Sequence, residues 1–211
     1  MSLRQVQLGA IGLGYDLGAS GADGKFGART EAALRALIDN RGQPLNRSAP
    51  PPRIATPIAG RLFQGTARHP IDEIIVHCSD TRPDWMAGQP LAAKVAEIRR
   101  WHVEERKWRD IGYHYIIDRD GAQAMGRPES VIGAGVEGRN AGVIHIVLIG
   151  GHGCAATDPF DRNFTPAQDA ALRRVIANIS ARTAIESVTG HNDWARKACP
   201  GFNVATWLNA A

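Results

Sequence analysis

The chain has 211 residues and a mass of 22.7 kDa, with 44% hydrophobic and 22% charged residues. At roughly 150 residues per domain this length predicts one or two domains, and the composition is that of an ordinary globular protein, which excludes bulk disorder. The net charge of +4 lies mostly in residues 1–56, whose 7 basic and 4 acidic groups give +3. Such a basic segment favours a polyanionic partner (nucleic acid, anionic lipid or wall polymer), unless it serves solubility alone.

No stretch of the sequence suits a membrane span or a secretory signal. The apolar runs fall short of the ~18 residues that cross a bilayer, and Met1–Gln5 lacks the charged and then apolar layout of a signal peptide. We therefore expect synthesis in the cytoplasm without a signal peptide, and no membrane insertion. Three cysteines, Cys78, Cys154 and Cys199, are an odd number, which favours free thiols or a metal ligand over a disulfide framework.

Residues 1–40 predict a small helical module. Val6, Ala10 and Leu13 lie on one helical face, glycines interrupt the pattern, and helical spacing resumes over residues 30–37. Residues 41–57 contain five prolines and no helical or alternating apolar period, which indicates a semi-rigid linker. Residues 58–211 then form a second, larger module.

The second module alternates strand and helix patterns. Apolar, β-branched runs predict four strands, at residues 71–77, 113–118, 143–149 and 187–190. Helical spacing from Leu91 to Trp108 predicts a helix after the first strand. Thr165 suits an N-cap and Pro166 the first position of a later helix, whose apolar face continues to Ile179.

Three potential metal ligands stand at or just after strand ends. His77 ends the first strand, His191 follows the last, and Cys199 comes eight residues later. Two imidazoles and a thiolate suit Zn²⁺ and leave a fourth position for water, as a catalytic site requires. The spacing alone also permits structural roles for these residues, and five other histidines compete: His69, His102, His114, His145 and His152.

Six segments occur in a specific order between Ile71 and Trp207. They are VHCSDTRP (76–83), IRRWHVEERKWRDIGYHYIIDRDG (98–121), Gly-Arg-Asn (138–140), VLIGG (147–151), NFTPAQ (163–168) and GHNDWARKACPGF (190–202). In this order they resemble the zinc-dependent N-acetylmuramoyl-L-alanine amidases of type 2, especially the phage lysozyme, or endolysin, branch. The resemblance implies an α/β fold with a central mixed β-sheet flanked by helices.

The resemblance also implies site residues and a reaction. His77, His191 and Cys199 fall where the family places its metal ligands. Tyr113 and Lys197 fall on its catalytic positions. The implied reaction is Zn²⁺-assisted hydrolysis of the amide between N-acetylmuramic acid and L-alanine. Lys197, two residues before Cys199, can stabilise negative charge on the carbonyl oxygen, although an isolated lysine here also suits a solvated surface charge.

Tyr113 can donate a hydrogen bond to the reacting oxygen, with a core aromatic as the alternative. On a regular strand it shares a face with Tyr115 while His114 points to the other, so we expect His114 to be a hydrogen-bonded core residue. By the same alternation Cys78 faces away from the metal. Asp193 suits either a carboxylate that orients His191 or Lys197, or an exposed loop acid. Substrate-binding residues and the general base stay unassigned, since no HExxH arrangement occurs.

Two positions depart from the family pattern. The stretch 133–136 has Gly135 where the phage lysozymes carry a histidine, and His145 stands in place of a small residue. Any contact made by the family's histidine is therefore absent or supplied from elsewhere. The strand context of His145 favours a packing role.

The N-terminal segment resembles the small three-helix peptidoglycan-binding modules. It carries their signature as Leu13-Gly14-Tyr15, Asp23-Gly24, Phe26-Gly27 and Thr30. A helical appendage without a ligand is the alternative. A nucleotide-binding glycine loop is rejected, because the third glycine is missing and no strand precedes it.

Together these features predict a monomeric endolysin that binds and cleaves peptidoglycan, with no nucleic-acid partner. Such a protein acts on periplasmic peptidoglycan after the membrane has been opened. A cytosolic amidase that recycles anhydro-muropeptides is one alternative, and a wall-binding module would be useless to it. A non-catalytic peptidoglycan-recognition protein is another, and it normally lacks the thiolate ligand that Cys199 provides here.

Overall fold

The computed structural model describes Gln7, Thr30 and residues 60–210. The chain divides into two units, Met1–Pro50 and Pro51–Ala211. In the first unit, Gln7 and Thr30 are both helical and buried, and the Gln7 side-chain amide donates to Thr30 Oγ1 over 3.0 Å. Apart from these two residues, the helical module expected at 1–40 and the linker expected at 41–57 lie outside the described residues.

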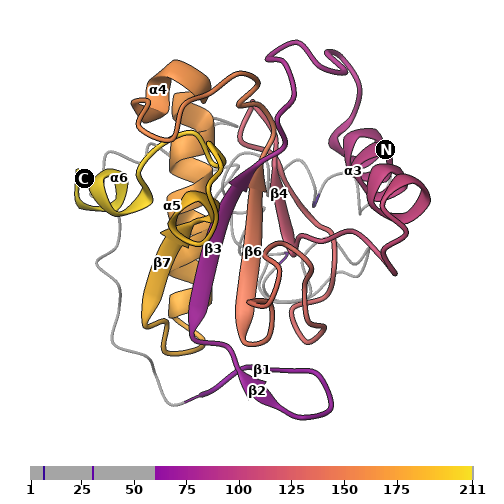
Figure 1. Cartoon of the computed structure of the whole chain (residues 1–211), viewed down its shortest axis with the longest axis vertical. Helices are drawn as coiled ribbons and strands as arrows, with labels where there is room; N and C mark the ends of the chain where they lie inside the picture. The colour runs from indigo at the N-terminus through magenta and orange to yellow at the C-terminus, as the bar shows by residue number, and fades with distance from the viewer. Residues whose placement is uncertain (1–6, 8–29, 31–59, 211) are drawn as a thin grey trace. The chain divides into compact units, whose positions relative to one another are not determined.

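The second unit is built on a five-stranded mixed sheet (Figure 1), which confirms the fold expected from the sequence. Its strands, in spatial order, are β5 (Gln123–Met125), β4 (Tyr115–Ile117), β6 (Val143–Leu148), β3 (Glu73–Cys78) and β7 (Ser187–Gly190). The β3 strand lies parallel to β6 and to β7, and β4 lies parallel to β6. The short β5 runs antiparallel to β4. Every residue of β3 and β6 is buried, which explains their near-continuous apolar sequences.

A two-stranded hairpin, β1 (Phe63–Gln64) and β2 (His69–Pro70), precedes the sheet and was not predicted. Strands of two residues carry no apolar period from which they could be found. Gln64 is fully buried, and its amide donates to the carbonyl of Val143 over 3.0 Å and accepts from the N–H of Gly142. The hairpin is thereby fastened to the beginning of β6.

Four α-helices accompany the sheet. They are α3 (Leu91–Arg100), α4 (Phe160–Asn163), α5 (Pro166–Ser180) and α6 (Val204–Asn209). The helix expected up to Trp108 is shorter, because α3 passes into a π-helical turn, η1 (Trp101–Glu105), and ends there. The predicted start of α5 is confirmed: Thr165 and Gln168 form a reciprocal capping box, and Pro166 occupies the first turn.

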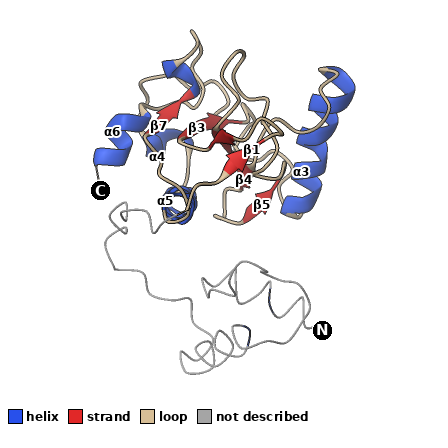
Figure 2. Ribbon diagram, turned by 90° about the horizontal axis from the view of Figure 1, so that it is seen from below, coloured by secondary structure: helices blue, strands red, loops and turns tan. Residues whose placement is uncertain are grey.

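Apolar side chains form separate clusters on the two faces of the sheet. Helix α5 contributes Leu172 and Val175 to one cluster, which includes Ile146 of β6 and continues to Trp207 of α6. Helix α3 contributes Val95 and Ile98 to the other, which contains Ile116, Val147 and Ile149. Figure 2 shows α5 beneath the strands and α3 beside β5. We call these the α5 face and the α3 face.

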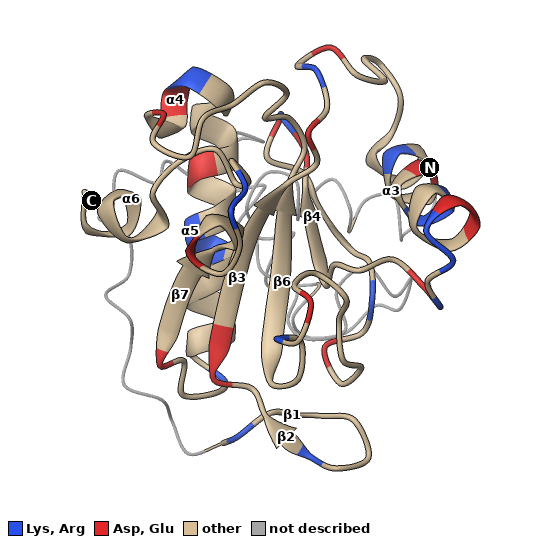
Figure 3. Cartoon of the chain, in the orientation of Figure 1, with Lys and Arg blue, Asp and Glu red and all other residues tan. Residues whose placement is uncertain are grey.

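Charged residues are concentrated on helices and loops (Figure 3). Glu73, at the beginning of β3, is the charged residue among the five strands of the sheet, and the Arg139 side chain pairs with it over 2.8 Å. Among the described residues, we find no helix that combines the length and apolar character needed to cross a bilayer.

Candidate functional site

Three ligand atoms converge at one edge of the sheet. The Nδ1 atoms of His77 and His191 are 3.2 Å apart, and Cys199 Sγ lies 3.9 Å from His77 Nδ1. All three atoms lie within 4.8 Å of one another. The parallel register explains why these atoms lie close together, because Val76 pairs with Gly190 and the next residues of the two segments are His77 and His191.

The two imidazoles are held in their neutral form. Burial lowers the pKa of His77 well below its usual value, and the neighbouring His145, His191 and Lys197 lower it further. Burial and the charge of Lys197 also lower the pKa of His191. Metal ligands must be deprotonated, so neutral imidazoles whose Nδ1 atoms converge with a sulfur fit a borderline-soft cation such as Zn²⁺.

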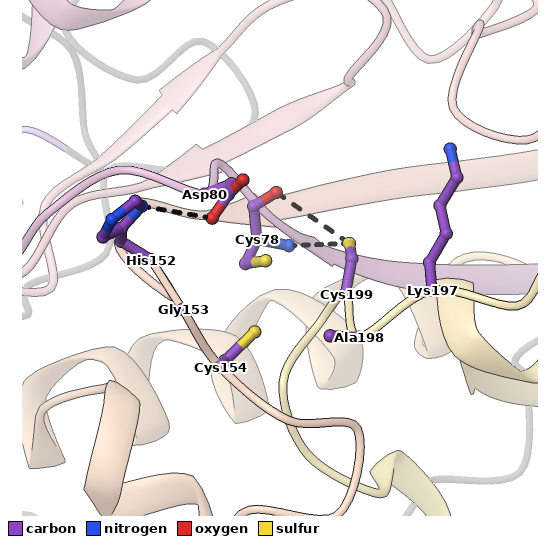
Figure 4. Close-up of a pocket in the computed structure, with 8 residues that line it drawn as sticks. All are labelled: Cys78, Asp80, His152, Gly153, Cys154, Lys197, Ala198 and Cys199. Carbon is purple, nitrogen blue, oxygen red and sulfur yellow. Dashed lines mark hydrogen bonds and ion pairs between the residues drawn. The ribbon is translucent and has the colours of Figure 1, made fainter.

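Cys199 lies in a loop after the 3-10 turn η2 (His191–Asp193) and borders a hollow of about 500 Å³ (Figure 4). The backbone N–H of Cys78 donates to Cys199 Sγ over 3.2 Å, which holds the sulfur beside the end of β3. The Cys78 side chain belongs to the α5 face, while the His77 ring lies beside Tyr113 of the α3 face. Hydrogen bonding to Cys199 and burial raise the pKa of the Cys78 thiol, which therefore stays protonated.

Lys197 is exposed and lines the same hollow as Cys199. Figure 4 shows its side chain leaving the loop next to Cys199. Its positive charge acts on the ligand atoms, because it contributes to the lowered pKa values of His77 and His191. A cation in this place can stabilise negative charge that develops next to the three ligands.

The Tyr113 ring packs against the His77 ring, with their centroids 5.2 Å apart. Burial raises the pKa of its phenol, so the hydroxyl remains a hydrogen-bond donor at neutral pH. His102 supports this segment, since its Nδ1 accepts the N–H of Gly112 over 3.0 Å and its ring lies 5.3 Å from Tyr113. Nothing in the sequence pattern singled out His102 for this role.

The expected alternation of faces around Tyr113 is wrong. Strand β4 begins only at Tyr115, so Tyr113 precedes the regular strand and packs on the α3 face, whereas Tyr115 packs on the α5 face. His114 lies on the same side as His77, stacked on His145 at 5.8 Å. Its expected character is confirmed, because the ring is fully buried, lies 2.9 Å from the carbonyl of Val131 and accepts the N–H of His145.

Asp193 is exposed, and its carboxylate accepts the backbone N–H of Gly190 over 2.7 Å. It closes the turn on which His191 is carried. Asp193 is thus the exposed loop acid of the two alternatives, and its hydrogen bond is to the backbone of the turn and not to the side chain of His191 or Lys197.

His145 is the site residue that the sequence analysis placed in the core without a further role. It is fully buried, as expected, but its Nδ1 also lies 3.0 Å from His77 Nε2. A Cβ atom at Gly135 would lie 2.5 Å from the same Nδ1. The two positions that depart from the family pattern are therefore in contact. The signal for this was period-two spacing, because Val147 pairs with His77 and His145 projects from the same face of β6.

Comparison with known families identifies one match, described as N-acetylmuramoyl-L-alanine amidase, over residues 67–202. The chain is 40% identical over 140 residues to the endolysin of Escherichia phage T7, covering 66% of this chain and 87% of that protein. It is 39% identical over 144 residues to the endolysin of Klebsiella phage KP32, covering 68% of this chain and 89% of that protein. All five predicted site residues fall within the matched range.

Among solved structures, bumblebee PGRP-SA superposes with a TM-score of 0.55 at 20% identity, covering 76% of this chain and 90% of that chain. Wild-type Drosophila PGRP-LB superposes with a TM-score of 0.51 at 26% identity, covering 74% and 87%. The first similarity shows the fold alone, and both agree with the mixed sheet described above.

Proposed function

The chain belongs to the N-acetylmuramoyl-L-alanine amidase family and is a peptidoglycan amidase; from this premise we propose that it works as an endolysin with one zinc ion held by His77, His191 and Cys199. The observation that carries the zinc proposal is the convergence of two imidazole nitrogens and one sulfur within 4.8 Å. Three protein ligands leave a fourth position open, as in catalytic zinc sites.

The chemical state of His77 and His191 and the position of Cys199 suit zinc binding. Both imidazoles have lowered pKa values, so neither must lose a proton at neutral pH to present its Nδ1 atom. The backbone N–H of Cys78 holds the Cys199 sulfur in place with a hydrogen bond. When bound, zinc would polarise the scissile carbonyl and lower the pKa of a water molecule toward ~7.

Two further residues act on the carbonyl oxygen as the amide is attacked. We assign Lys197 to the stabilisation of the negative charge that develops there, because its ammonium already acts electrostatically on both ligand imidazoles. We assign Tyr113 the role of a hydrogen-bond donor, because its raised phenol pKa keeps the proton on the hydroxyl. The leaving group is the amine of L-alanine, which departs when the bond to N-acetylmuramic acid breaks.

We propose further that residues 1–40 bind peptidoglycan and that residues 41–57 tether them to the amidase. Synthesis in the cytoplasm and action on periplasmic peptidoglycan after membrane opening fit this arrangement and the endolysin relatives. A recycling amidase has no use for a wall-binding module. A recognition protein without activity is disfavoured by the complete set of three ligands.

The test is to incubate the full chain with purified peptidoglycan, with and without a chelator, and to identify the new ends. We expect free L-alanine amines and intact lactyl groups on the muramic acid, loss of activity with the chelator, and recovery on adding Zn²⁺. New reducing ends without new amines would show a glycosidase and refute the amidase. Full activity in a chelated protein shown to be metal-free would refute the zinc proposal.

A further inference from the structure

A second buried histidine contacts the ligand His77 on the side away from the other two ligands. His145 Nδ1 lies 3.0 Å from His77 Nε2, whereas His77 Nδ1 faces His191 Nδ1 at 3.2 Å. Both histidines are 1% exposed or less, so water does not compete for this contact. The two ring nitrogens of His77 thus have different partners: Nδ1 lies next to His191 and Cys199, and Nε2 contacts His145.

The contact fixes where the proton of His77 must be. A neutral imidazole has one N–H donor and one acceptor nitrogen. If Nδ1 of His77 presents its lone pair to a cation, Nε2 carries the proton and donates it to His145 Nδ1. Metal-binding histidines commonly donate their second N–H to a carboxylate, a backbone carbonyl or water, which orients the ring. In this chain an imidazole takes that place.

The same assignment fixes the tautomer of His145. Its Nδ1 must be the acceptor, so its proton sits on Nε2, which is a buried nitrogen with no hydrogen-bond partner in the described part of the chain. A buried donor without a partner costs stability, so its retention calls for an explanation. Orientation of His77 supplies one.

The surroundings of His145 hold its ring in this position. His114 stacks on it with an interplanar angle of 14°, and the backbone N–H of His145 donates to His114 Nδ1 over 2.9 Å. On another side, a Cβ atom at Gly133 would lie 2.5 Å from Cδ2 of His145, and one at Gly135 would lie 2.5 Å from its Nδ1. Only a backbone without side chains leaves room for the ring there.

The loop that carries these glycines is itself fixed. The side-chain oxygen of Asn140 accepts the N–H groups of Gly135 and Val136 over 2.9 and 3.0 Å. The ring of His145 is therefore enclosed by β6, His114 and an anchored loop. Such an enclosure restricts its rotation and keeps Nδ1 directed at His77.

We propose that His145 is a positioning residue for metal binding: it accepts the Nε2 proton of His77, holds the ring in the tautomer whose Nδ1 binds the cation, and depends on Gly135 for space. This inference rests on the proposed zinc site. It means that the affinity for Zn²⁺ depends on His145 as well as on the three proposed ligands.

Zinc affinity of the full chain, measured by competition with a chromophoric chelator, tests the proposal. His145→Leu fills the space without an acceptor, and we expect its affinity to fall 10- to 100-fold. His145→Asn can place an amide oxygen near the Nδ1 position, so we expect most of the affinity to return. His69→Leu, which removes a histidine from the β1–β2 hairpin, is the matched control and should leave affinity unchanged. Urea unfolding of each metal-free variant reports separately on the fold.

A nitrogen NMR correlation of the His77 ring provides a readout that packing alone would not change. We expect one tautomer in the wild type and in His145→Asn, with the proton on Nε2, and a mixture of tautomers in metal-free His145→Leu. Gly135→Ala should lower zinc affinity in the wild type by displacing the His145 ring. The same change should have little further effect in the His145→Leu background, where no acceptor is left to displace.

The outcomes separate this inference from the proposed function. If the wild type binds no zinc, both are overturned. If the wild type binds zinc and His145→Leu binds it equally well with an unchanged His77 tautomer, the role of His145 alone is overturned. Equal losses in His145→Leu and His145→Asn would also overturn it, because volume and not the acceptor would then control affinity.

Discussion

Replacing Lys197 by alanine separates charge stabilisation from metal binding. Loss of one donor to a developing oxyanion typically lowers turnover by ~10²–10³-fold. Lys197 is exposed, so water screens its charge and the lower end applies. We therefore expect kcat to fall about 100-fold, which is about 2.7 kcal/mol of barrier.

The same substitution should leave zinc in place. The charge of Lys197 lowers the pKa values of His77 and His191, so its removal makes both imidazoles better bases and retains or strengthens metal binding. The assay is the release of L-alanine amines from a soluble muropeptide, with zinc content measured on the same preparation. Arg196→Ala is the matched control, because it removes an adjacent exposed cation.

Any one of three results would refute this role of Lys197. An unchanged kcat would remove Lys197 from the mechanism. Loss of zinc in proportion to the loss of activity would make it a residue that supports the ligand loop. An equal loss in Arg196→Ala would show that general surface charge, and not the position of Lys197, controls the rate.

Three other predictions concern the Cys199 ligand, the pH dependence of stability and the N-terminal residues. Cys199→Ser should lose most of its zinc and its activity while Cys154→Ser retains both, as metal analysis will show; a full equivalent of zinc in Cys199→Ser would refute the thiolate assignment. His102 and His114 have pKa values of about 4 in the fold, against about 6.5 in an unfolded chain, so the unfolded chain takes up protons first. Stability should thus be full above about pH 6.5 and fall as the pH drops toward 4, and urea midpoints of the wild type and His102→Asn should show a shallower loss in the variant. Deleting residues 1–56 should reduce lysis of intact sacculi, less so at high salt, and leave the rate on a soluble muropeptide nearly unchanged; equal losses on both would refute a wall-binding role.

Residues whose position depends on local pattern were predictable. The apolar run that ends at His77 predicted β3, and Thr165 with Pro166 predicted the beginning of α5. Parallel neighbouring strands end at the same edge of a sheet, so a histidine at the end of one strand and another just after a second strand could be expected to lie close together. The resemblance to the family supplied the third proposed ligand and the proposed catalytic positions.

The sequence did not predict the contacts of residues whose position depends on strand register or on irregular backbone. Placing His145 next to His77 requires the knowledge that β6 is adjacent to β3 and that Val147 is the partner of His77. The face on which Tyr113 packs was predicted wrongly, because side chains alternate only in a regular strand and β4 begins two residues later. The contact between Gly135 and His145 is between a loop and a strand, and sequence periodicity does not predict contacts of this kind.

The separation of the ligands along the chain has a consequence for the timing of activity during synthesis. His77 and Cys199 are 122 positions apart. At about 5–20 residues per second, a ribosome needs about 6–24 s to pass from one to the other. For most of that interval β3 lacks its neighbour β7, which ends at Gly190, and the nascent polypeptide cannot assemble all three proposed ligands until Cys199 has been added. With the zinc site proposed here, a product terminated before Cys199 carries no complete metal centre, and the cell that makes the enzyme meets amidase activity only from chains translated past Cys199.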